Sequence, residues 1–142
     1  MLKLVFLTDA FYQQYKDCCE IEQKNTRPYI RIEIDLNGVT WAIPMRSNIN
    51  HPHVIWTDKQ NHCGIDFSKA VVVEKPQKYI SNTKPHIREN EFKVLKQLNE
   101  HRIKQRLEKY IRDYQKAKEN PELPRNERLI ECSTLQYFED FL

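Results

Sequence analysis

The chain has 142 residues, of which 39% are hydrophobic and 11% aromatic, enough for one hydrophobic core and too few for two. A charged fraction of 30% predicts a well-solvated surface, and the hydrophobic content argues against a disordered chain. No apolar run approaches the roughly 20 residues that span a bilayer, and the first one meets Asp9 too early for a signal peptide. We therefore expect a single cytoplasmic domain over residues 1–142.

The net charge of +3 is unevenly distributed along the chain. Residues 84–118 carry 11 Lys and Arg against 5 Asp and Glu, a local charge of +6, which leaves −3 for the remainder. Such a segment indicates a polyanionic partner such as RNA, DNA or an anionic membrane, or else a helix face that is merely solvated. The four cysteines lack a C-x-x-C spacing and suggest neither a zinc site nor a disulfide framework.

The first third of the chain predicts a strand, a helix and a hairpin. Residues 3–7 form an apolar strand, and residues 9–15 follow as a helix with aromatic side chains at i, i+4 spacing. Apolar and polar residues then alternate with period 2 over residues 29–36. Asn37-Gly38 favours a tight hairpin turn, and residues 39–43 form the return strand.

The middle of the chain predicts a polar loop between short strands. Pro44 is expected to close the hairpin strand, and residues 45–52 are polar and loop-like. Further strands are predicted over residues 53–57 and 68–74, on either side of a turn that contains Gly64.

Helices are predicted to dominate the last third. Apolar residues at helical spacing predict one long amphipathic helix from about residue 87 to 118, whose opposite face carries the basic excess. Residues 120–124 contain two prolines that end it, and Ser133 is suited to cap a short aromatic-rich terminal helix. The order of elements favours an α+β fold with a mostly antiparallel sheet.

RNA is one of the polyanions that the basic segment could bind, and we therefore ask which residues could cleave it. Cleavage without a metal requires the 2′-hydroxyl to lose a proton, the 5′-oxygen to gain one, and the charge on the phosphate to be stabilised. Taken singly, each suitable residue is an ordinary surface group. They concentrate in the predicted sheet half: Arg27, Tyr29, Arg31, Arg46, Ser47, His51, His53 and Lys69.

Four features of this set indicate a site. Arg46-Ser47-Asn48 follows a strand-ending proline, where a hydroxyl, backbone amides and a guanidinium can converge on a phosphate. His51-Pro52-His53 offers two groups that titrate near neutrality, of which His53 is better fixed by its strand. Lys69 is either an edge-strand charge or a phosphate-directed cation. Tyr12 is either on the polar face of the first helix, able to stack on a base, or partly packed in the core.

Other chemistry is disfavoured by the sequence. The H-x-H spacing suits a metal, but no further ligand cluster lies nearby in the sequence, so no metal is expected. With two glycines in all and no nucleotide-cradling loop, no cofactor is expected.

Four short motifs in register resemble the toxins of type III toxin–antitoxin systems, the ToxN/AbiQ group, and are nearest to its TenpN and CptN branches. The motifs lie in the first ~75 residues, and the predicted helices that follow extend the resemblance over nearly the whole chain. They are Leu4-Val5-Phe6-Leu7-Thr8 with Phe11-Tyr12, Arg27-Pro28-Tyr29, Trp41-Ala42-Ile43-Pro44-Met45-Arg46-Ser47, and Cys63-Gly64-Ile65-Asp66-Phe67-Ser68-Lys69-Ala70-Val71-Val72.

The resemblance implies a compact, barrel-like antiparallel sheet wrapped by helices and metal-independent cleavage of RNA to a 2′,3′-cyclic phosphate. It also implies an RNA partner, a repetitive pseudoknotted antitoxin that the toxin trims from its precursor and then binds in a closed assembly. Cellular mRNA is the other substrate, and abortive phage infection is the implied role.

By position, Tyr12, Arg27 and Ser47 match family site residues, and Arg46 precedes the serine. The lysine that some family members have shortly after that serine is missing here, so the proton donor or phosphate cation is sought among His51, His53 and Lys69. The predicted catalytic residues are Tyr12, Arg27, Arg46, Ser47, His53 and Lys69. The predicted RNA-binding residues are Tyr29, Arg31, His51, Arg102, Arg106, Lys109 and Arg112.

Two other functional classes fit the sequence. One is a non-catalytic RNA-binding module that uses the basic 84–118 helix, which predicts salt-sensitive binding to RNA that stays intact. The other is a structural partner that pairs its 87–118 helix with another helix, although the charged residues 99–102 interrupt any heptad pattern.

Overall fold

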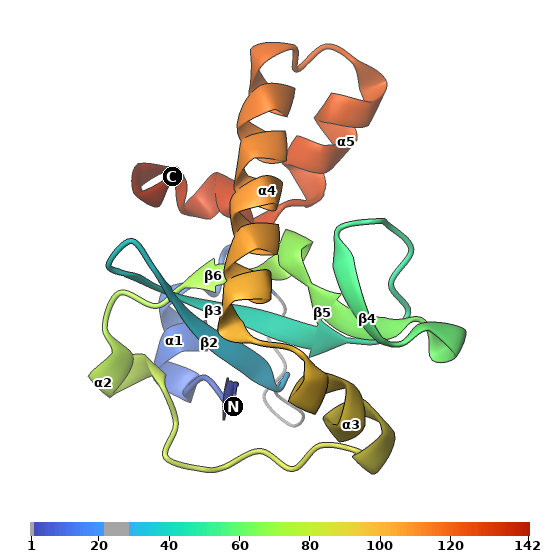
Figure 1. Cartoon of the computed structure of the whole chain (residues 1–142). Helices are drawn as coiled ribbons and strands as arrows, with labels where there is room; N and C mark the ends of the chain where they lie inside the picture. The colour runs from blue at the N-terminus through green and yellow to red at the C-terminus, as the bar shows by residue number, and fades with distance from the viewer. Residues whose placement is uncertain (1, 22–28) are drawn as a thin grey trace.

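The computed structural model describes residues 2–21 and 29–142, and these residues form an α+β fold (Figure 1). The strands are β1 (Lys3–Val5), β2 (Arg31–Leu36), β3 (Val39–Arg46), β4 (Val54–Asp58), β5 (Cys63–Asp66) and β6 (Val71–Val72). They form one antiparallel sheet in the order β1-β2-β3-β5-β4, with β6 also paired to β3. The sheet is open, with β1 and β4 as its edges within the described residues, so the expected barrel is not seen.

The helices gather on the sheet and beyond it. They are α1 (Asp9–Gln14), α2 (Pro76–Tyr79), α3 (Glu89–Gln97), α4 (Glu100–Glu119) and α5 (Pro124–Cys132), with 3₁₀ turns over Lys59–Asn61, Phe67–Lys69, Thr134–Tyr137 and Glu139–Phe141. In Figure 1, α4 crosses the sheet and projects from it, and α5 folds back beside the far half of α4. None of the helices in the described ranges is both long and apolar enough to cross a bilayer.

The predicted hairpin is confirmed, although its second strand is longer than expected. Asn37 and Gly38 both have positive φ, 53° and 82°, as a tight turn between twisted strands requires, and the Gly38 amide donates to Asp35 Oδ1 at 3.1 Å. The prediction that Pro44 ends the strand is wrong. β3 continues through Pro44 to Arg46, which brings Arg46 to the side of β5.

Gly64 does not lie in a turn, as the sequence suggested, but inside β5. The turn before β5 is formed by the 3₁₀ segment Lys59–Asn61 and by His62, whose φ is +56°. A Cβ atom on Gly64 would lie 2.5 Å from the backbone oxygen of Ile55 on β4. Glycine is therefore required by the close approach of two strands.

We expect Gly64→Ala to lower the free energy of unfolding by about 2 kcal/mol or more, because a backbone atom must move to admit the methyl group. Gly38→Ala is the matched control. Its positive φ costs about 1 kcal/mol, but nothing lies within 4 Å of the added Cβ. Urea unfolding of the two variants measures the difference. A Gly38 variant that is less stable than the Gly64 variant would contradict this explanation.

The long helix predicted over residues 87–118 is two helices. Leu98 has extended backbone angles, φ −91° and ψ 143°, and separates α3 from α4. Asn99 caps α4, since its side chain accepts a hydrogen bond from the Arg102 amide at 2.8 Å. The break lets α3 pack against β4 while α4 takes a different direction across the sheet.

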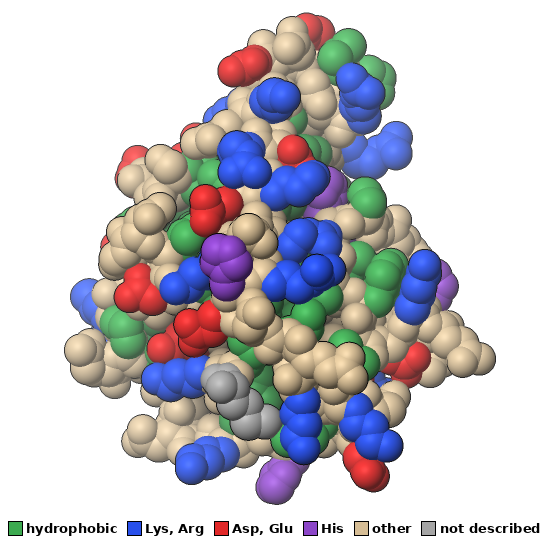
Figure 2. Space-filling model, in the orientation of Figure 1, with side chains coloured by type: hydrophobic (Ala, Val, Ile, Leu, Met, Phe, Trp, Pro, Cys, Tyr) green, Lys and Arg blue, Asp and Glu red, His purple; other side chains and the backbone are tan. Residues whose placement is uncertain are grey.

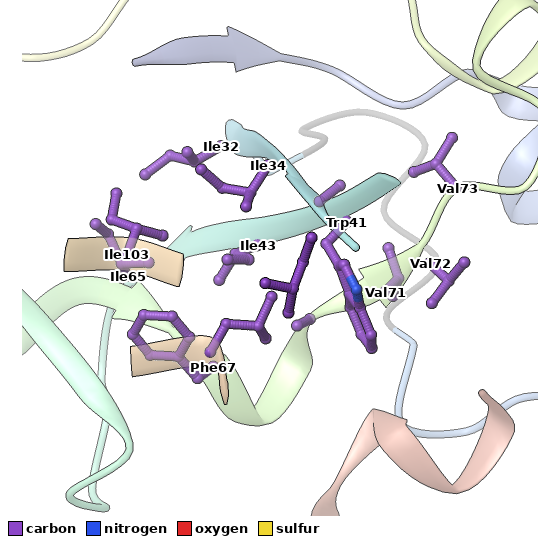
Figure 3. Close-up of a cluster of buried hydrophobic side chains, with 14 of the residues drawn as sticks. Ile32, Ile34, Trp41, Ile43, Ile65, Phe67, Val71, Val72, Val73 and Ile103 are labelled. Atoms are coloured by element: carbon purple, nitrogen blue, oxygen red, sulfur yellow. The ribbon is translucent and has the colours of Figure 1, made fainter. Parts of the chain in front are cut away.

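The core joins the sheet to α4 and to the C-terminal segment. Figure 3 shows Ile32, Ile43, Ile65, Phe67 and Ile103 among a cluster of side chains from β2, β3, α4 and the residues around β5. The terminal segment is docked, with Leu135 and Phe138 buried. Its predicted cap is confirmed, because Ser133 Oγ accepts from the Leu135 amide at 3.1 Å. The strand predicted over residues 68–74 is mostly irregular, and only β6 pairs within it.

Candidate functional site

A buried carboxylate, Asp66, lies at the centre of the candidate site. It ends β5, and no part of its side chain is exposed. Arg46 Nη1 donates to Asp66 Oδ2 at 2.5 Å, and Oδ1 accepts from the Ser68 hydroxyl at 2.6 Å and the Ser68 amide at 2.9 Å. His51 Nε2 lies 3.1 Å from Oδ1. These four side chains form what we call the Asp66 network.

The Asp66 carboxylate is held in its charged form. Burial raises the pKa of Asp66, but the hydrogen bonds from His51, Ser68 and Arg46 outweigh it and lower the pKa from 3.8 to about 2. The interactions with Asp66 also act on Arg46. Burial alone lowers the pKa of Arg46, yet its bonds to Tyr29 and Asp66 raise it overall. The network therefore pairs a buried anion with a permanent cation.

The same network fixes the ring of His51. His51 Nδ1 accepts a hydrogen bond from the His53 amide at 3.1 Å, which assigns the ring proton to Nε2. Nε2 faces both Asp66 Oδ1 and the Ser68 hydroxyl, the latter at 3.2 Å. Because the Ser68 hydroxyl donates to Asp66, it is not arranged as a nucleophile activated by His51. Both ring nitrogens of His51 are thus engaged in positioning.

His53 differs from His51, because its imidazole makes no hydrogen bond among the described residues. Its ring lies 5.6 Å from that of His51 and meets Tyr110 of α4 edge-on at 5.1 Å, both between ring centroids. Burial lowers the pKa of His53 below 6.5, and the neighbouring His51 lowers it further. The imidazole is therefore uncharged at neutral pH and able to accept a proton.

Hydrogen bonds to the C-terminal segment hold residues 68–70 in place. The Thr134 hydroxyl donates to the carbonyl oxygens of Ser68 and Ala70. Tyr110 donates to Ser133 Oγ at 2.8 Å, and Lys69 Nζ donates to the Cys132 carbonyl at 2.7 Å. The end of α5 and the residues after it therefore stabilise one wall of the site.

Three cations, one of which is Arg46 of the Asp66 network, line a separate small cavity. Arg31, Arg46 and Lys69 line a cavity of ≈ 10 Å³ together with Tyr29. That volume is about one water molecule, so RNA does not enter this cavity and can meet Arg46 and Lys69 only at their partly exposed surfaces. Arg31 was expected at the surface, but its residue is only 2% exposed, and its long bonds to the Ala42 and Lys69 carbonyls measure 3.4 and 3.5 Å.

Tyr12 is a core residue, which is the second of the two placements that the sequence left open. It is 4% exposed and packs edge-on against Phe11 at 5.5 Å between ring centroids. Its hydroxyl and the Nε of Arg31 are buried and have no hydrogen-bond partner of acceptable geometry among the residues that the structure describes. Burial lowers the pKa of Arg31, and the nearby Tyr12 opposes that shift. Tyr12 cannot stack on a base in this conformation.

Ser47 and Arg27 complete the predicted catalytic residues. Ser47 follows β3 directly, is exposed, and has no hydrogen-bond partner within residues 2–21 and 29–142. It stays a predicted phosphate contact. Arg27 lies outside the described residues.

The predicted basic face of the long helix is divided. Arg106 Nη2 donates to the Val54 carbonyl at 2.9 Å, and Lys109 pairs with Asp113 at 2.9 Å. Arg112 lines a different groove, with Trp41 of β3, and Arg102 is exposed. In Figure 2, Lys and Arg side chains gather along α4 and over α5, with acidic groups among them.

His53 lies between two pockets. One, of ≈ 90 Å³, is lined on the α4 side by residues that include Arg106 and Lys109. The other, of ≈ 320 Å³, is lined by the two histidines, Ser68, Tyr110 and residues of α5. This larger cavity, which we call the His51–His53 pocket, is the place where a substrate can reach the imidazoles.

The structure brings the predicted residues Arg46, His51 and His53 together around Asp66 and the neighbouring pocket, whereas Asp66 and Ser68 were not predicted as site residues. The spacing Asp66-Phe67-Ser68 after a strand is a signal for a local side-chain turn, in which the carboxylate accepts from the amide two residues on. This spacing does not predict that the Asp66 carboxylate also contacts Arg46 and His51.

Within residues 2–21 and 29–142, no three His, Cys, Asp or Glu side chains are placed to hold a metal ion. Comparison with protein-family models, with curated proteins and with solved structures gave no significant match to this chain.

Proposed function

We propose that this protein is a metal-independent endoribonuclease toxin of a type III toxin–antitoxin system. It would cut mRNA in the cytoplasm and its own repetitive antitoxin precursor, and the bound pseudoknot RNA would inhibit it. Abortive phage infection is the role that this pairing suggests. The proposal joins the motif resemblance to the chemistry of the Asp66 network and the His51–His53 pocket.

The observation that carries the proposal is the pair of unlike imidazoles at one pocket. His51 is fixed by Asp66 and Ser68, whereas the His53 imidazole makes no hydrogen bond within the described residues and is uncharged at neutral pH. An uncharged, positioned imidazole is the group that general-base removal of a 2′-proton requires.

In the proposed reaction, His53 takes the proton from the 2′-hydroxyl, and the 2′-oxygen forms a bond to phosphorus. The bond from phosphorus to the 5′-oxygen breaks, and the leaving oxygen takes up a proton. Because His51 is engaged at both ring nitrogens and Tyr12 is buried, we assign that proton to the ammonium group of Lys69. Ser47 and Arg46 contribute hydrogen bonds that stabilise the phosphate charge.

Growth inhibition tests the biological part of the proposal. We expect expression of the chain to arrest growth and Ser47→Ala to relieve the arrest, since the exposed hydroxyl can be removed without disturbing the fold. Ser81→Ala, which removes a hydroxyl that accepts a local bond from the Thr83 amide, is the matched control and should remain toxic. If the Ser47→Ala variant arrests growth at an equal protein level, Ser47 is not part of the active site. Normal growth of cells that express the unaltered protein would contradict the proposal that it is a toxin.

A further inference from the structure

Helix α5 supplies part of the lining of the His51–His53 pocket, and no function was predicted for its residues. Arg125, Arg128, Leu129 and Cys132 line the pocket from α5. Their spacing of three and four residues places them on one face of the helix. The loop of residues 50–53, Ser68 and Tyr110 of α4 complete the lining.

The two arginines are poorly explained by folding. Arg125 lies in the first turn of α5 and Arg128 in the next, near the positive end of the helix dipole, where a cation is disfavoured. Both are exposed, and neither has a hydrogen bond, ion pair or ring contact with any described residue. By contrast, Arg106 and Lys109 on α4 are already bonded.

The charge of the pocket is one-sided. No Asp or Glu is among the described residues that line it, whereas two guanidinium groups are. The Asp66 carboxylate nearby is buried and already paired with Arg46. An anion entering the pocket therefore meets two cations and no exposed carboxylate on its walls.

The pocket is also suited to a planar ring. Its volume of ≈ 320 Å³ lies in the range of small-ligand sites. Pro52 and Leu129 give it apolar surface, and the rings of His51, His53 and Tyr110 line it. Unpaired RNA bases are held by stacking on such rings and on arginine planes, while arginines hold the phosphates.

We infer that this pocket binds a single unpaired nucleotide of the RNA next to the cleaved bond, with its phosphate held by Arg125 and Arg128. The inference rests on the proposed function for its ligand, RNA. It gives α5 the role of a substrate-binding helix whose end is anchored by Lys69, through the Cys132 carbonyl.

Cysteine protection tests occupancy of the pocket. Cys132 lines the pocket and is exposed, and Cys19 is an exposed thiol that does not line it. We expect adenosine 3′-monophosphate or uridine 3′-monophosphate to slow alkylation of Cys132 at least tenfold at saturation and to leave Cys19 reactive. Adenosine and inorganic phosphate are the comparison probes. Protection by phosphate alone to the same degree, or no protection by either nucleotide, would overturn the inference.

Binding of an uncleavable RNA separates this inference from the proposed function. A single-stranded 2′-O-methyl RNA lacks the attacking hydroxyl, so its affinity is measured without cleavage. We expect Arg125→Ala/Arg128→Ala to weaken binding at least tenfold and to reduce the salt-dependence slope by about 0.7, the value for one lost phosphate contact on a single strand.

Lys93→Ala/Lys116→Ala removes the same charge from exposed positions outside the pocket and should weaken binding no more than about twofold. Equal losses in the two double variants would overturn the pocket assignment. Loss confined to the arginine variant, in a protein that does not cut unmodified RNA, would uphold the pocket and contradict the nuclease.

Discussion

Replacing His53 by Gln is expected to lower kcat/KM for RNA cleavage by about 100-fold or more, the usual contribution of a general base. The side chain has no hydrogen bond to lose within the described residues, and Gln keeps much of its volume against Tyr110. The fold should therefore persist, as circular dichroism would show. His101→Gln, at an exposed position on α4, is the matched control and should retain full activity.

The pH profile distinguishes a proton acceptor from a group that only packs in the pocket. Burial lowers the pKa of His53, and only the uncharged imidazole accepts a proton. Activity should therefore be full near neutrality and fall about tenfold per pH unit below the lowered pKa of His53, at a pH below 6.5. The residual activity of His53→Gln should lack this acidic limb. An unchanged limb in the variant would show that another group accepts the proton.

Asp66→Asn is expected to lower the free energy of unfolding by about 3 kcal/mol, because it removes the anionic partner of the partly buried Arg46 guanidinium. For a chain of this length, that loss lowers Tm by roughly 6–12 °C. Cleavage should fall even where the variant is folded, since His51 loses its anionic partner. Asp140→Asn is the matched control. Its carboxylate is exposed and makes no hydrogen bond or ion pair with the described residues, so the change should alter the free energy of unfolding by less than about 0.5 kcal/mol.

Acid unfolding checks the same residue independently. The pKa of Asp66 is lowered in the folded protein from 3.8 to about 2, so its contribution is complete above pH 3.8 and is lost as the pH falls toward 2. The contribution is about 2 kcal/mol. Asp66→Asn should abolish this part of the acid sensitivity. Equal acid sensitivity in the variant and the unaltered protein would contradict the assigned network.

Local chemistry explains what could be predicted of the fold. Asn37-Gly38 fixes the hairpin because both positions adopt positive φ at little cost. Ser133 caps the terminal segment through its own side chain. The prediction of one helix over residues 87–118 is wrong at Leu98. This residue continues the apolar spacing of a helix, but its backbone is extended. The Asn99 cap was the overlooked signal that a new helix begins there.

The candidate site was only partly predictable because its contacts are long-range. Asp66 reads as the polar end of a strand, and its partners Arg46 and His51 precede it by 20 and 15 residues. Arg31 occupies a polar position in an alternating strand, and Asp35 on the same face is exposed, yet the Arg31 side chain is buried. The sequence does not show that Arg125 and Arg128 lie near the histidines. They join His51 and His53 in the lining of one pocket only because α5 folds back against α4.

End-group analysis of cleaved RNA tests the central proposal most directly. The purified protein is incubated with single-stranded RNA in excess EDTA, and the products are identified by mass. The proposal predicts fragments that end in a 2′,3′-cyclic phosphate and begin with a 5′-hydroxyl, while the 2′-O-methyl RNA stays intact. RNA that is bound but uncut, or fragments that carry 5′-phosphates and 3′-hydroxyls, would contradict it.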